Sequence, residues 1–292
     1  MPAGYVKLSR QRPEVKDCPL LMRAATPLDQ PRALGAARLS TKCVDGRSCI
    51  DGLRQSGALK LLFPRTKERV EAIVINTAGG ITGGDRFELR ATAGAGTRLA
   101  LTTQAAERAY RAQAGQTGRT ATHLEANADS VLHWLPQETI IYQEAAFERS
   151  LRVALHPTAR FVMVEPIVFG RKAMGEHLSR AHFRDRVDIR RNGKPLYRDG
   201  VDLSGDIAGL LNRPAVAGGA RAMAALVWHA PEAEAQLSAI RAMIGPGGGA
   251  SLLDRSLLVA RILAPDGFEM RQRVVPILEH VTGNSLPQSW RL

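Results

Sequence analysis

The sequence predicts a mainly β protein: a β-rich body of stacked sheets with a small helical part near the C-terminus. Apolar and polar residues alternate over most of the segment from about residue 58 to residue 191. This period of two is typical of half-buried strands. Turn signals separate many short candidate strands, which favours stacked sheets over a fold of alternating strands and helices. Helical spacing of apolar residues occurs only late in the chain.

The candidate strands follow one another closely. Residues 150–155 are representative, because Leu151, Val153 and Leu155 share one face and Arg152 lies on the other. Asn192-Gly193 is the strongest hairpin signal, since this pair accepts the positive φ angles of a tight turn. The expected strands cover residues 72–75, 86–93, 97–103, 119–126, 131–135, 139–143, 150–155, 160–168, 184–190, 222–228 and 256–263.

Two helices are expected near the C-terminus. Residues 232–244 carry apolar side chains at helical spacing and stop at Gly245-Pro246. Residues 269–281 also have an apolar helical face, and Pro276 either kinks this helix or marks its first turn. The stretch from Gly245 to Ala250 has the spacing Gly-x-Gly-x-x-Ala, but a dinucleotide site needs a strand before it, and here a helix precedes. A flexible turn is expected instead.

Length and composition fit one large domain. Of the 292 residues, 45% are hydrophobic and 23% are charged, as in ordinary globular proteins. We expect residues 1–34 to be a loosely ordered lead-in and residues 35–292 to be a single domain, with its helical part within about 205–292. No run of about 18 apolar residues occurs, so no membrane span is expected. Cys18, Cys43 and Cys49 are too few for a disulfide framework, which favours a reducing, cytoplasmic location.

The chain is strongly basic. Its net charge is +12, and all but seven of its 40 basic residues are arginine. Nucleic acid, an acidic protein partner and a solvated basic surface are all consistent with this charge. The arginines are spread along the chain, and only 5% of the residues are aromatic. A stacking platform for single strands is therefore hard to build, and we expect no nucleic-acid partner.

A double-glycine loop follows a buried candidate strand at residues 72–75. Its sequence is Asn76-Thr-Ala-Gly-Gly-Ile-Thr-Gly-Gly-Asp85. The glycines allow a sharp turn and close contact. A phosphate-binding P-loop would place Lys and Ser or Thr after the last glycine, but Asp85 stands there and would repel a phosphate. We interpret the loop as structural, with its geometry set by Gly79, Gly80, Gly83 and Gly84.

The sequence contains no catalytic or metal-binding motif of a familiar kind. None of its seven histidines forms His-x-His or His-Glu-x-x-His, and no Gly-x-Ser-x-Gly elbow occurs. We therefore predict no enzyme and no tight metal site. Carboxylates in apolar or glycine-rich surroundings remain, and burying them is costly unless they are paired or solvated. Salt bridges to Arg108, Arg171 or Arg186 are one interpretation, and an internal polar path for a cation is the other. The carboxylates are Asp85, Glu107, Glu138, Glu165 and Glu176.

Several of these segments together resemble the UreD (UreH) family of urease accessory proteins. The similarity runs in order from about Gly35 to the C-terminus. It does not include Cys43 and Cys49, to which we attach no family role. The segments that carry it are Leu61-Leu-Phe-Pro-Arg65, the double-glycine loop, Thr102-Thr-Gln-Ala-Ala-Glu-Arg-Ala-Tyr-Arg111, His133-Trp-Leu-Pro-Gln-Glu-Thr139, Phe169-Gly-Arg-x-x-Met-Gly-Glu176, Arg184-Asp-Arg186, Pro195-Leu-Tyr197 and Leu286-Pro-x-x-Trp290.

The resemblance implies a non-enzymatic chaperone that helps deliver nickel to apo-urease. Family members bind UreF, which in turn binds the nickel-carrying GTPase UreG, and have a stacked-sheet body with an internal tunnel proposed as the nickel route. The matching positions here are Asp85, Glu107, Glu165 and Asp199, with Glu176 close by. Nickel would be held transiently, with no tightly bound cofactor. An enzyme that binds an anionic ligand at the double-glycine loop and a basic nucleic-acid-binding module are the alternatives.

Overall fold

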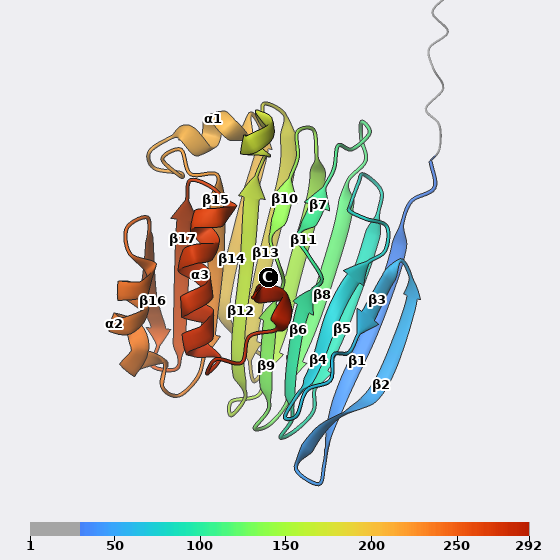
Figure 1. Ribbon diagram of the computed structural model, residues 1–292, viewed down its shortest axis with the longest axis vertical. Coiled ribbons are helices and arrows are strands. Elements are labelled where there is room, and N and C mark those ends of the chain that lie inside the picture. The colour runs from blue at the N-terminus through green and yellow to red at the C-terminus, as the bar shows by residue number, and fades with distance from the viewer. Residues whose placement is uncertain (1–29, 292) are drawn as a thin grey trace, which may run out of the picture. The chain divides into compact units, whose positions relative to one another are not determined.

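Two β-sheets stack face to face, and the longer helices lie on the outside of one of them (Figure 1). The computed structural model describes residues 30–291, and residues from Arg32 onward form one compact unit. The predicted fold class, mainly β with a small C-terminal helical part, is confirmed. Most of the lead-in expected at residues 1–34 lies outside the described residues.

The first sheet has seven strands within residues 30–291. Its five central strands run parallel, and each edge is closed by an antiparallel hairpin partner. One of these hairpins turns at Asn192-Gly193, as predicted. In spatial order the strands are β14 (Lys194–Gly205), β13 (Ala181–Arg191), β11 (Ala146–Leu155), β8 (Gly118–Ala126), β5 (Arg86–Ala93), β1 (Leu34–Val44) and β2 (Arg47–Gly57).

The second sheet has ten strands in the same part of the chain. Its centre is parallel, and its two ends are antiparallel. In order the strands are β16 (Gly248–Asp254), β17 (Leu257–Ala264), β15 (Ala222–His229), β12 (Arg160–Phe169), β9 (Val131–Leu135), β6 (Arg98–Thr103), β4 (Val70–Asn76) and β3 (Leu59–Leu62). The short β10 (Thr139–Ile141) pairs with β12, and the short β7 (Glu107–Ala109) pairs with β10.

The chain passes back and forth between the two sheets. From β4 to β13 successive long strands join alternate sheets. Two neighbouring strands of one sheet are therefore separated in the sequence by a strand of the other sheet, and we call each such pair of strands one turn of the winding. Arg86 of β5, for example, pairs with Arg119 of β8. The sequence predicted the stacking but not this parallel pairing. It also missed β1, β2, β3, β7, β14 and β16. The last of these begins at Gly248, inside the segment where a flexible turn was expected.

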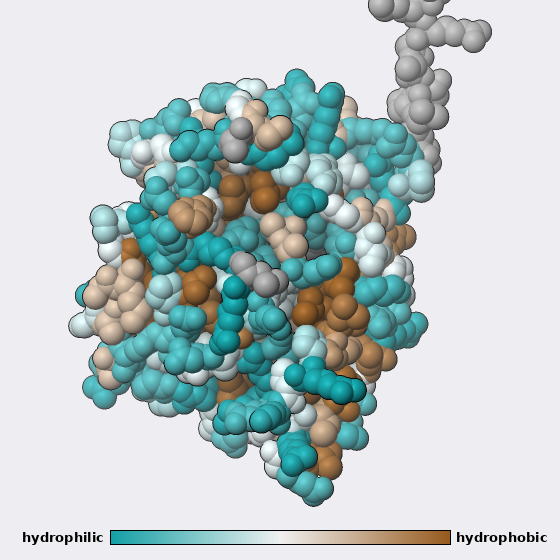
Figure 2. All heavy atoms as spheres, viewed as in Figure 1, coloured by the Kyte–Doolittle hydropathy of each residue, from teal (hydrophilic) through white to brown (hydrophobic). Residues whose placement is uncertain are grey.

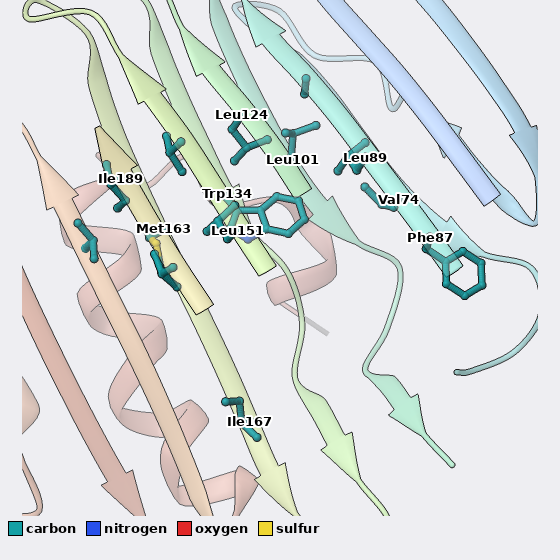
Figure 3. Packing of buried hydrophobic residues seen from close by; sticks show 14 of the residues in the cluster. Val74, Phe87, Leu89, Leu101, Leu124, Trp134, Leu151, Met163, Ile167 and Ile189 are labelled. Carbon is teal, nitrogen blue, oxygen red and sulfur yellow. The ribbon is translucent and has the colours of Figure 1, made fainter. Parts of the chain in front are cut away.

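The core between the sheets is apolar, as the alternation requires. Met163 and Ile167 of β12 face the other sheet (Figure 3), whereas Val162 and Val164 face the helices. Each buried side chain of this size contributes roughly 1.5–3 kcal/mol of transfer free energy. A single strand therefore serves two cores, which explains why β12 is buried on both faces.

Three α-helices occur in the described residues: α1 (Ile207–Asn212), α2 (Ala233–Ile244) and α3 (Gly267–Val281). α2 agrees with its predicted range, and α1 was not predicted. α3 begins two residues before its predicted start, capped by Asp266, and Pro276 lies within it rather than in its first turn. Two short 3-10 helices, η1 (Lys172–Met174) and η2 (Gln288–Trp290), complete the set. None of the helices in the described residues is long and apolar enough to cross a membrane.

The face that carries α3 mixes hydrophilic side chains with hydrophobic patches (Figure 2). Large apolar side chains are exposed at several places in the described residues. Phe268, at the start of α3, is 71% exposed, and Met174, in η1, is 73% exposed. Single exposed apolar residues of this kind are ordinary on monomers.

Candidate functional site: a buried carboxylate cluster between the sheets

Glu165 lies in the core between the two sheets. Period two places it on the same face of β12 as Met163 and Ile167, and its exposed fraction is 2%. An unpaired carboxylate would be very costly in this position. The sequence identified the anomaly correctly, since Glu165 interrupts an otherwise apolar run.

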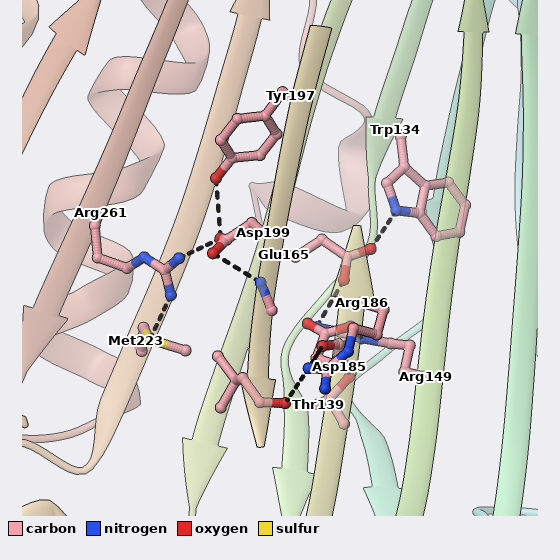
Figure 4. A network of polar contacts seen from close by, with 12 residues as sticks. Trp134, Thr139, Arg149, Glu165, Asp185, Arg186, Tyr197, Asp199, Met223 and Arg261 are labelled. Atoms are coloured by element: carbon pink, nitrogen blue, oxygen red, sulfur yellow. Dashed lines mark hydrogen bonds and ion pairs between the residues drawn. The ribbon is translucent and has the colours of Figure 1, made fainter. Parts of the chain in front are cut away.

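Glu165 belongs to a cluster that we call the buried carboxylate cluster, which consists of Trp134, Thr139, Arg149, Glu165 and Asp185 (Figure 4). Trp134 Nε1–H donates to Glu165 Oε1 at 2.6 Å. Arg149 Nη2 lies 2.6 Å from Glu165 Oε2. The same guanidinium donates to both oxygens of Asp185, at 3.1 and 2.6 Å, and to Thr139 Oγ1 at 3.2 Å. One arginine therefore joins β11, β12 and β13 across the core.

The charges of this cluster do not cancel, because one guanidinium serves two carboxylates. Burial raises the pKa of Glu165 to about 7, and Asp185 adds to the rise, while Arg149 and the bond from Trp134 oppose it. Burial by itself lowers the pKa of Arg149, but Asp185 and Glu165 together raise it above its ordinary value. The contact between Arg149 and Glu165 Oε2 is close but poorly aligned for a hydrogen bond. This oxygen therefore retains capacity for another partner.

A cavity of about 90 Å³ adjoins the cluster between the sheets. Its lining includes both Glu165 and Glu107, so the structure brings together two of the five predicted carboxylates. Glu107 accepts from Asn76 Nδ2 at 3.2 Å and from the Arg108 backbone N–H at 3.0 Å. Burial raises the pKa of Glu107 despite these two bonds. The cavity is polar on these sides and large enough for a few water molecules.

Asp85 has a different environment. It is 4% exposed, and its two oxygens accept the backbone N–H groups of Ala33 and Thr82, each at 2.8 Å. It does not line the cavity, although its charge contributes to the raised pKa of Glu107. Asp85 therefore fixes the double-glycine loop against the start of the described chain.

The four glycines of this loop are needed for two distinct reasons. Gly79 and Gly84 have φ angles of 80° and 89°, which favour glycine. Gly80 and Gly83 are crowded: a Cβ on Gly80 would lie 2.2 Å from the Tyr110 ring, and one on Gly83 would lie 2.7 Å from Gln116 Cβ. Positive φ explains Gly84 but not Gly83, where close packing is the constraint.

Asp199 and Glu176 lie apart from the cavity lining. Asp199 accepts from Tyr197 Oη at 2.9 Å and forms an ion pair with Arg261 of the other sheet. It lies on the same face of the first sheet as Asp185, two positions further along in register. Glu176 accepts three bonds from Arg171, through the backbone N–H, Nε and Nη2. Arg171 is one of the salt-bridge partners named from the sequence.

Arg149 and Asp185 are the residues that sequence reasoning missed. Glu165 pairs with Arg149 rather than with Arg108, Arg171 or Arg186. A signal was present, because Asp185 stands between the inward-facing Phe183 and Val187 at period two. Over residues 30–291, no group of three or more His, Cys, Asp or Glu side chains is arranged to hold a metal ion.

Two of the three cysteines lie in the described part of the chain. Cys43 on β1 is exposed, Cys49 on the neighbouring β2 is half-buried, and both are free thiols. Their register pairs Cys43 with Ser48 and Cys49 with Lys42. Cys18 lies outside the described residues.

Comparison with known proteins identifies the class of protein to which this chain belongs. The family model described as UreD urease accessory protein matches residues 33–291, so the molecule is an accessory protein and not an enzyme. The chain belongs to the UreD family.

Curated relatives agree along nearly their whole length. The urease accessory protein UreD of Roseobacter denitrificans is 60% identical over 273 residues, covering 94% of this chain and 100% of that protein. UreD of Ruegeria sp. strain TM1040 is 52% identical, with 90% and 91% covered. UreD of Agrobacterium fabrum is 43% identical, with 92% and 95% covered.

Proposed function

We propose that this protein assists nickel delivery to apo-urease and that the ion passes transiently along the buried carboxylates. The observation that supports this most directly is the internal cavity shared by Glu107 and Glu165. Two carboxylates beside one small cavity can replace part of the hydration shell of a divalent cation. Asp85, Glu176 and Asp199 would hold the surrounding backbone and sheets in place.

The chemistry of the cavity suits passage better than storage. Nickel binds tightly to nitrogen and sulfur ligands, so oxygen ligands alone would hold it weakly. The guanidinium of Arg149 lies beside Glu165 and repels a cation. Because this repulsion lowers the affinity of the cavity for a cation, an ion that enters can also leave. A tight resident site would work against transfer.

The proposed partners are UreF, UreG through UreF, and apo-urease. Exposed apolar side chains such as Phe268 and Met174 are suitable for protein contacts. The anionic-ligand alternative has less support, since Asp85 already takes the backbone N–H group of Thr82 inside the double-glycine loop. We propose no nucleic-acid and no membrane partner, and a cytoplasmic site of action.

The test uses Glu107→Gln and Glu165→Gln, which keep the size of the side chain and one acceptor oxygen but remove the charge and the second acceptor oxygen. Glu125→Gln, at an exposed position on β8, is the matched control. Nickel per urease and urease activity are measured at limiting nickel, with co-purification of UreF as a check on folding. Both cavity variants should bind UreF but load less nickel, and the control should load normally.

Two results from the variants would count against the proposed nickel route. One is full loading at limiting nickel by both cavity variants. The other is a tight nickel site on the isolated protein that is lost in the same variants, because that would indicate storage. A strain that lacks the protein should make urease with little nickel, and normal nickel content in that strain would rule out the accessory role in loading.

A further inference from the structure

The outer face of the seven-stranded sheet carries a row of ionisable side chains across all seven strands, and six of these seven side chains are basic. Each residue of the row is the direct register partner of the next, so neighbours are about 4.8 Å apart in the hydrogen-bonding direction. We call this set the arginine row. In order across the sheet it consists of Arg54, Arg38, Arg90, His123, Arg152, Asp188 and Arg198.

The row carries uncompensated positive charge. Arg38, Arg54 and Arg152 are exposed and have no ion-pair or hydrogen-bond partner in the described part of the chain. Like charges directly opposite each other on adjacent strands are destabilising, so folding alone does not explain the arrangement. The pKa of His123, in the middle of the row, is lowered by burial and by Arg90 and Arg152. A lowered histidine pKa is what a positive electrostatic potential produces, because nearby positive charge disfavours the protonated imidazole.

No helix in residues 30–291 covers this face. α2 and α3 pack on strands of the ten-stranded sheet. The main contact of α1 with a strand is with β14, at the edge of the seven-stranded sheet. The face is hollowed along the row by a depression of about 330 Å³. Its ionisable lining residues are four basic ones and two acidic ones: Arg90, His123, Arg152, Arg190, Glu125 and Asp188. The arginine row is therefore accessible and concave, and three of its arginines, Arg38, Arg54 and Arg152, have no partner within the described residues.

We propose that the arginine row is a docking surface for the acidic face of a helix in a partner protein. The row spans six inter-strand steps, or about 29 Å, and a helix of about 20 residues has that length. Carboxylates at positions i, i+3 and i+7 of a helix recur at a mean rise of about 5 Å, close to the strand spacing. Guanidinium groups pair with carboxylates through two parallel hydrogen bonds.

Other occupants match the surface less well. A second copy of this chain, with a net charge of +12, would be repelled. The row contains no Phe, Tyr or Trp on which the bases of a single strand could stack. The proposal does not depend on the nickel route, because the row lies on the outside of the seven-stranded sheet and the cavity lies between the sheets.

The test measures binding of the full chain to an alanine-rich helical peptide of about 20 residues with glutamate along one face. The row variant is Arg38→Gln, Arg54→Gln and Arg152→Gln. These arginines have no carboxylate partner to leave unpaired. The control variant is Arg65→Gln, Arg213→Gln and Arg255→Gln, which removes the same charge at exposed positions elsewhere. We expect the row variant to bind at least about tenfold more weakly and the control variant within about twofold of wild type.

Each remaining outcome decides the question. Equal weakening in both variants would mean that net charge alone drives binding and would overturn the proposal, as would no binding by wild type. Tighter binding of a DNA duplex of matching length, lost in the row variant, would reassign the surface to nucleic acid. The melting temperature of the row variant should equal or exceed that of wild type, because like-charge repulsion is relieved. A peptide with glutamine in place of glutamate should not bind.

Discussion

Replacing Glu165 by glutamine should make the protein more stable at alkaline pH. Glutamine keeps an oxygen for the Trp134 N–H group, and Arg149 keeps Asp185 as its partner. What the substitution removes is a carboxylate whose pKa is raised by burial from 4.5 to about 7. In wild type, the unfolded chain ionises this group near pH 4.5 and the folded chain near pH 7. The stabilising contribution of the protonated group is therefore present below pH 4.5 and is lost as the pH rises through 7.

The size of the effect follows from the shift, since each pKa unit is worth 1.36 kcal/mol. The variant should exceed wild type by up to about 3 kcal/mol at pH 8 and match it near pH 4.5. The free energy of unfolding is measured in urea at both pH values by tryptophan fluorescence. Glu125→Gln, at an exposed position, should follow wild type at both. If the curves for Glu165→Gln and wild type run parallel from pH 4.5 to 8, the assignment of a raised pKa to Glu165 is wrong.

Three further outcomes are expected from thermal or urea denaturation. Asp85→Ala should cost about 2–4 kcal/mol by leaving two backbone N–H groups without an acceptor, and Asp85→Asn should cost less; equal losses would refute this account. Gly84→Ala should cost about 1–3 kcal/mol through its φ of 89°, whereas Gly83→Ala should destabilise through crowding; unchanged melting temperatures would show a tolerant loop. Burial, with Arg69, Arg160 and Arg98, lowers the pKa of His133 to about 3. The free energy of unfolding should therefore fall by up to about 1.4 kcal/mol per pH unit as the pH drops below 6.5. His133→Gln should flatten this slope, and an unchanged slope would contradict the assignment.

Local patterns predicted the strands that have one buried face. The structure gives the predicted range without change for β5 (Arg86–Ala93), since alternation depends only on which face is buried. The predicted range of β9 (Val131–Leu135) is also unchanged, although this strand is buried along nearly its whole length. β2 (Arg47–Gly57) was missed because it is exposed along most of its length and so shows no alternation. Parallel pairing could not be predicted, because a strand's own sequence does not say which strand about 30 residues away lies beside it.

The same distinction between local and distant information applies to the site. Glu165 was recognised because its immediate neighbours are apolar. Its partners Arg149 and Trp134 come from other strands, and only the fold brings them within 2.6 Å. Glu107 was predicted from its segment, but the cavity that it shares with Glu165 depends on the packing of two sheets.

The passage of the chain between two sheets has a consequence for how the molecule assembles. One turn of the winding, which contributes one strand to each sheet, cannot bury its inner face alone. Each turn is therefore stabilised only when the next turn packs beside it, as in solenoid proteins. Most strand contacts are distant in sequence, which predicts slow folding and a growing edge that stays open to other chains. The antiparallel hairpins β1–β2 and β13–β14 close the two ends of the seven-stranded sheet. In both hairpins the outer strand runs antiparallel to the five central strands, so the parallel winding of the chain ends there.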